Sequence, residues 1–120
     1  MIYSEQQLIS LAHNNPKELA RILTSPGGDI RMLTCGAEIL GGEVKEESVV
    51  LPALRILVKH VHANVREGAT IGISSFYTEK KPPQDILDKL KAMSVSDPSP
   101  AIREYTKAIL KDFEDLNEGT

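Results

Sequence analysis

Apolar residues recur every three or four positions through almost the whole chain, and short polar segments rich in Gly, Pro, Ser or Asn interrupt them. This spacing places apolar side chains on one face of an α-helix. No stretch alternates between apolar and polar residues for long enough to predict a β-strand. We therefore predict an all-α fold, with helices at about residues 4–13, 16–24, 28–41, 46–61, 63–77, 83–94 and 99–115.

Local signals mark several of the predicted helix ends. Ser4 and Gln7 fit a capping box, in which two side chains satisfy N–H groups at the start of a helix. Asp29 can cap the third helix through its carboxylate. We expect Gly41-Gly42 to end that helix, because paired glycines are typical of turns.

The fifth predicted helix, residues 63–77, has small residues on its buried face, at Ala69 and Gly72. A helical glycine costs about 1 kcal/mol relative to alanine, so we expect another helix to approach closely there. The preceding helix, residues 46–61, is the most apolar in the chain, and its predicted buried face extends to Val61.

A unit of 35–37 residues recurs along the chain, because Arg66 lies 35 residues after Arg31 and 37 before Arg103. The segment 62–76 aligns with 99–113, and a fainter copy begins near Arg31. Self-similarity at such a period is typical of stacked helical repeats. We predict one domain, 1–120, with a capping helix at 1–15, repeats at 16–42, 43–78 and 79–115, and a frayed tail at 116–120.

The second and third copies resemble the HEAT-repeat family of armadillo/HEAT-type α-solenoids. The resemblance depends on Val50–Leu54, an apolar first helix with proline, and on Asn64–Ala69, a second helix that opens with Val-Arg. Asp97–Arg103 matches in the third copy and Asp29–Arg31 matches weakly in the first. The likeness implies a right-handed solenoid of about three helix pairs with an N-terminal capping helix. The tetratricopeptide repeat has a similar period, but its Trp, Gly and Tyr signature is missing.

In such proteins the arginine at the start of each second helix is structural. The resemblance implies that Arg31, Arg66 and Arg103 form a ladder that holds neighbouring turns through hydrogen bonds to carbonyls or carboxylates. The alternative is a row of donors for an acidic partner. His60 and His62 occupy positions where acidic turn residues are common in the family, so the contact between turn and arginine stays open for that repeat.

The second helix of each pair lines the concave face of a HEAT-like solenoid, where partners commonly bind. Carried over to this chain, the outward and partner-binding positions are Glu38, Thr70, Ser74, Tyr77, Lys107 and Lys111.

The composition and the net charge disfavour several classes of function. The formal net charge is −3 and aromatic residues make up 4%, whereas nucleic-acid binding needs clustered Lys and Arg. Cys35 is the only cysteine, which excludes an internal disulfide and favours a reducing compartment. Without a signal peptide pattern or an apolar run of about 18 residues, we expect a cytoplasmic protein that binds neither nucleic acid nor membrane.

No pattern predicts a catalytic residue, a cofactor or a metal site. His60 and His62 are two apart, so on a helix they would point about 200° from one another and could not share one metal. Ser25–Gly28 precedes a helix but lacks the lysine of a phosphate-binding loop. No serine lies in a nucleophile elbow, and Glu46-Glu47 point apart.

These observations favour a non-catalytic module that binds another protein through its solenoid surface, such as a small inhibitor of the immunity-protein type or an adaptor. We expect a monomer or a weak homo-oligomer. One alternative is a HEAT-like enzyme domain, since the family includes DNA glycosylases and bilin lyases. The other is a structural unit that associates with itself.

Overall fold

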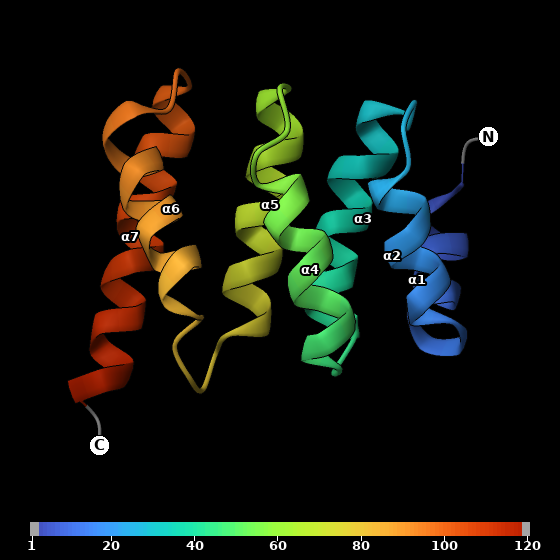
Figure 1. Cartoon of the computed structure of the whole chain (residues 1–120), viewed down its shortest axis with the longest axis horizontal. Helices are drawn as coiled ribbons and strands as arrows, with labels where there is room; N and C mark the ends of the chain where they lie inside the picture. Colours follow the sequence, from blue (N-terminus) through green and yellow to red (C-terminus); the bar gives the residue numbers. More distant parts are fainter. Residues whose placement is uncertain (1–2, 119–120) are drawn as a thin grey trace. The chain divides into compact units, whose positions relative to one another are not determined.

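The computed structural model describes residues 3–118, which form seven α-helices and no β-strand (Figure 1). The all-α prediction is confirmed. By their internal contacts, the residues divide into two compact units, Met1–Phe76 and Tyr77–Thr120. The helices are α1 (Glu5–Asn14), α2 (Pro16–Thr24), α3 (Ile30–Glu43), α4 (Glu47–Leu57), α5 (Ala63–Phe76), α6 (Gln84–Ser96) and α7 (Pro100–Glu118).

The predicted helix starts are present because they depend on local hydrogen bonds. The Ser4 hydroxyl accepts from the Gln7 N–H at 3.2 Å, and the Gln7 side chain accepts from the Ser4 N–H at 2.8 Å. Asp29 caps α3 by accepting from the Met32 N–H at 3.1 Å. These bonds satisfy N–H groups that have no partner inside the helix.

Several predicted helix ends are wrong, and three of them change which residues are helical or buried in an informative way. Helix α3 continues through Gly41-Gly42 to Glu43, because packing against α5 outweighs the low helix propensity of glycine. Helix α4 ends at Leu57, and Val61, which we expected to be buried, lies in the following turn with 92% of its surface exposed. Helix α7 extends to Glu118, into the predicted tail. Residues 119–120 of that tail lie outside the described residues.

The first unit has two layers of helices (Figure 1). Helix α2 packs against α4 in one layer, while α3 packs against both α1 and α5 in the other. Further contacts between α1 and α2, α2 and α3, and α4 and α5 join the layers. The core between them is aliphatic, and its fully buried residues include Leu8, Leu19, Leu40, Leu54 and Ile73.

Helices α3 and α5 approach each other through glycines. A Cβ atom added to Gly72 would overlap the backbone carbonyl oxygen of Ala37, and one added to Gly41 would overlap that of Gly72. A Cβ on Gly68 would lie 2.5 Å from the carbonyl oxygen of Thr34. The expected close approach at Gly72 is therefore confirmed, and the partner helix is α3.

The second unit consists of α6 packed against α7. Both helices carry one buried apolar face. The buried apolar residues are Ile86, Leu90 and Met93 in α6, and Ile102, Ile109 and Phe113 in α7. Thr106 is also fully buried, and its hydroxyl donates to the carbonyl of Ile102 at 2.8 Å, which satisfies the polar group without a tertiary partner.

Candidate functional site

The turns before α5 and α7 contain the same arginine contact. Arg66 donates to the carbonyl oxygens of His60 at 3.1 Å and Val61 at 2.9 Å. Arg103 donates to the carbonyl oxygen of Asp97 at 2.6 Å. In both turns an acceptor lies six residues before the arginine. The contact is thus present in the histidine-containing turn, where the sequence had left it open.

The side chains of the two turns also make equivalent hydrogen bonds to the backbone. His60 accepts from the His62 N–H through Nδ1 at 3.0 Å, as the Asp97 carboxylate accepts from the Ser99 N–H at 2.9 Å. His62 then caps the first turn of α5 by accepting from the Asn64 N–H at 3.2 Å. An unprotonated imidazole nitrogen therefore replaces a carboxylate oxygen as the acceptor. Both Nδ1 atoms accept hydrogen bonds from backbone N–H groups of the turn, so His60 and His62 have a structural role.

Arg31 differs from the other two arginines of the proposed ladder. It is exposed, and no hydrogen bond or ion pair joins it to another residue in the described part of the chain. The carbonyl bonds of Arg66 and Arg103 close the turns that precede their own helices. These bonds stabilise individual turns, and Arg31 does not take the corresponding place in the first copy.

Two of the six positions expected to face outward are buried. Thr70 has no exposed surface, although it lies about 200° around α5 from Gly68 and from Gly72, which face α3. Its hydroxyl donates to the Glu67 carbonyl at 2.7 Å. Tyr77 is 1% exposed. The expectation that Thr70 and Tyr77 face outward is wrong. The buried surface of α5 is broader than its apolar pattern indicates and includes Thr70, while Tyr77, which follows the end of α5, is buried as well.

The other four predicted positions reach the surface. Glu38 and Ser74 are partly exposed in the first unit, whereas Lys107 and Lys111 are exposed in the second. Lys107 forms an ion pair with Glu104 at 3.2 Å, one turn earlier in α7. A binding role for these four residues stays a prediction.

Glu38 lines a pocket of about 230 Å³ between α3 and α5, together with Cys35 and Glu67. Partial burial raises the pKa of Glu38, and the nearby carboxylates of Glu67 and Glu5 raise it further. Burial also raises the pKa of the Cys35 thiol, with Glu5 and Glu38 adding to the effect. A raised thiol pKa disfavours the thiolate, so Cys35 lacks the activation of a nucleophilic cysteine.

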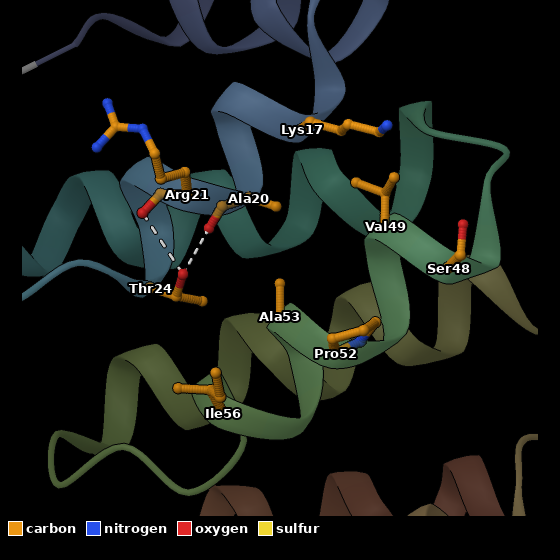
Figure 2. Close-up of a pocket in the computed structure, with 9 residues that line it drawn as sticks. All are labelled: Lys17, Ala20, Arg21, Thr24, Ser48, Val49, Pro52, Ala53 and Ile56. Atoms are coloured by element: carbon orange, nitrogen blue, oxygen red, sulfur yellow. Dashed lines mark hydrogen bonds between the residues drawn. The ribbon is translucent and has the colours of Figure 1, made fainter.

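A larger groove, of about 380 Å³, runs between α2 and α4 (Figure 2). The two helices contribute side chains from facing surfaces, and most of these side chains are apolar or small. The lining residues are Lys17, Ala20, Arg21 and Thr24 of α2, and Ser48, Val49, Pro52, Ala53 and Ile56 of α4.

The floor and the rim of this groove differ in exposure. Val49 and Ala53 form the floor, since both are buried. Pro52 is exposed at the rim, and 57% of the surface of Ile56 is exposed. Single exposed apolar residues are common, but here Ile56 and Pro52 continue an apolar depression. The result is one joined apolar surface.

The charges beside the groove are both positive and both on α2. Arg21 donates to the Glu18 carboxylate at 2.8 Å through Nε, and this bond lowers the pKa of Glu18. Within residues 3–118, Lys17 forms no hydrogen bond or ion pair. Figure 2 shows its side chain extending above Val49. The lining contains no carboxylate, so Lys17 is a cation available to a ligand of the groove.

The pattern of apolar residues did not predict this groove. The groove depends on α2 lying against α4, which are separated in sequence by the whole of α3. The available signals were local: Lys17 and Arg21 one turn apart on α2, and an isoleucine outside the buried stripe of α4.

Comparisons of the chain with models of protein families, with curated proteins and with solved structures found no match. Among the described residues, no group of three or more His, Cys, Asp or Glu side chains is placed to hold a metal ion. None of the helices that the structure describes has the length and apolar character needed to cross a membrane.

Proposed function

We propose that this protein is a non-catalytic module that binds another protein, and that the α2–α4 groove is its binding surface. The observation that carries the proposal is the open apolar groove of about 380 Å³ that ends in the exposed side chain of Ile56. Burying one such side chain is worth about 1.5–3 kcal/mol. A partner that covers the groove gains this energy without rearranging the fold.

The shape of the groove favours a macromolecular ligand over a small molecule. Sites for small molecules usually bury about 70–90% of the ligand surface, whereas this groove is open along α4. Its lining on that helix extends from Ser48 to Ile56, which corresponds to about 12 Å of helix at about 1.5 Å per residue. An elongated, shallow and apolar surface is better matched by a segment of a protein.

The chemistry of the titratable side chains is also more consistent with binding than with catalysis. The Cys35 thiol has a raised pKa, and the Nδ1 atoms of His60 and His62 accept turn hydrogen bonds. A small inhibitor of the immunity-protein type or an adaptor would use such a surface. Glu38 and its pocket on the other layer are a second candidate surface of the same function.

We further propose that the fold is a right-handed solenoid of three HEAT-like helix pairs, with α1 as the cap and α6–α7 as the third pair. Two observations support this assignment. In the first unit, α2 packs on α4 and α3 packs on α5, as in two stacked pairs. The bond from an arginine to a carbonyl six residues earlier recurs in the turns before α5 and α7.

Capture from native cell extract tests the binding function with two matched variants. Ile56→Glu places a charge in the groove, and Val95→Glu places the same charge on α6, where Val95 is 76% exposed. We expect the wild type and Val95→Glu to retain the same protein and Ile56→Glu to lose it at least about tenfold, which corresponds to about 1.4 kcal/mol. Circular dichroism should show equal helicity for all three. Retention of the partner by Ile56→Glu, or capture of no protein by the wild type, would contradict the proposal.

A further inference from the structure

We infer that the α2–α4 groove takes an amphipathic helix of a partner protein, and that this helix carries a carboxylate next to its apolar face, opposite Lys17. This inference rests on the proposed function and adds the conformation and the charge of the ligand.

The conformation follows from which recognition modes the surface permits. An extended peptide that adds a strand needs the exposed edge of a β-sheet, and residues 3–118 contain no strand. A polyproline segment docks between aromatic side chains, and none of the nine lining residues is aromatic. A helix laid in an apolar groove is the remaining common mode, and it uses apolar side chains spaced along one helical face.

The dimensions of the groove agree with a helix. Val49, Ala53 and Ile56 are spaced four and three residues apart, so they form one row along α4. Ala20 and Thr24 form the facing row on α2. The small side chains of Ala20 and Ala53 leave room for the side chains of a third helix between the two rows. Helix α2 has 9 residues, or about 13 Å, so the bound helix needs about three turns.

The charge follows from the two cations of α2. Lys17 has no partner in the described part of the chain, and the groove lining has no carboxylate. Arg21 is already bonded to Glu18, so Lys17 is the main determinant of the ligand charge that the groove prefers. The net charge of the whole chain is −3 and repels an acidic ligand at long range. At physiological salt this repulsion is screened beyond about 8 Å. The local attraction of Lys17 therefore determines which ligand charge is favoured in the groove.

Three synthetic helical peptides of about 15 residues test the inference. They share one apolar face of Leu and Ala, and their flanking positions are Glu, Lys or Gln. Each is titrated into the ¹⁵N-labelled full chain and followed by the shifts of backbone amides. We expect the Glu peptide to bind about fivefold tighter than the Lys peptide, the effect of about 1 kcal/mol from one exposed ion pair. The shifted amides should be those of α2 and α4.

Variants assign the effect to the groove. Lys17→Glu should remove the preference for the Glu peptide. Ile56→Ala should lower the affinity for all three peptides about tenfold, as expected for the loss of about 1.4 kcal/mol of apolar contact. Val95→Ala is the matched control and should change nothing. Both apolar side chains are exposed, so neither replacement disturbs the core.

The possible failures separate the inference from the proposed function. Equal binding of the three peptides, or tighter binding of the Lys peptide, overturns the acidic ligand and leaves a protein-binding groove. Absence of binding by all three up to about 1 mM overturns the helical ligand, while the capture experiment with Ile56→Glu decides the function independently. Shifts of the α2 and α4 amides with the concentration of the protein alone would identify a second copy of this chain as the occupant and overturn the inference.

Discussion

The two layers of the first unit pack in opposite ways. Between α3 and α5 the backbones meet through Gly41, Gly68 and Gly72, and at these three positions no space remains for even one added methyl group. Between α2 and α4 the facing side chains leave a groove of about 380 Å³. Helices can close on each other where small residues face each other. The comparison suggests that the closed layer stabilises the unit, while the open layer is available for binding.

The largest effect on stability should come from adding a methyl group where α3 and α5 are in closest contact. Gly72→Ala places a Cβ atom against the carbonyl of Ala37, and a backbone atom cannot move aside as a side chain can. We expect a loss of about 2–3 kcal/mol in the free energy of unfolding, typical of overpacking. Urea unfolding measured by circular dichroism gives this value. An unchanged midpoint would show that α3 and α5 are not held as closely as described.

The matched control for this prediction is Gly42→Ala. A Cβ on Gly42 would meet nothing within 4 Å, although Gly42 is helical and adjacent to Gly41. Alanine is favoured over glycine in a helix by about 1 kcal/mol, so this variant should be more stable than the wild type by about 0.5–1 kcal/mol. Opposite signs for Gly42→Ala and Gly72→Ala in the same urea experiment would establish that contact with α5 makes the difference.

The turn between α4 and α5 connects the open layer to the closed one. His60→Ala removes the acceptor for the His62 N–H and should destabilise the protein by about 1 kcal/mol, as for the loss of one capping bond. His60→Asp restores an acceptor of the type that Asp97 provides in the turn before α7. Its stability should stay within about 0.5 kcal/mol of the wild type. Equal destabilisation by Ala and Asp would refute the equivalence of the two turns.

The smallest effect concerns the carboxylate of Glu38. Its pKa in the folded protein is raised, chiefly by burial. As the pH rises through the carboxyl range, the unfolded chain therefore loses this proton first, and the folded state becomes less stable. Glu38→Gln should increase stability at pH 7 by a few tenths of a kcal/mol, since the group is largely solvent-screened. The gain should vanish below the ordinary pKa range of glutamate, which thermal unfolding at several pH values measures.

The sequence predicted those features that depend on neighbours in the chain. The bond between Ser4 and Gln7 and the cap at Asp29 are local, and both are present. The close approach at Gly72 was also predictable, because a costly glycine inside a helix requires a packing reason. The all-α fold followed from the period of the apolar residues.

The errors concern features that depend on tertiary packing. Gly41 is a poor helix former by itself, and only contact with Gly72 of α5 explains why the helix continues through it. Thr70 is polar, but it is fully buried in the folded protein. Ile56 lines a groove only because α2 lies beside α4 in the folded unit. The spacing of apolar residues therefore could not predict the candidate site, because its two walls are 24 residues apart at their closest, from Thr24 to Ser48.

Hydrogen exchange of the amides, measured on the protein alone and with the captured partner bound, tests the central claim most directly. We expect slower exchange in α2 and α4, where the partner covers the groove, and no change on the Glu38 side of α3 and α5. Protection confined to the Glu38 side, with α2 and α4 unaffected, would contradict the assignment of the groove as the binding surface.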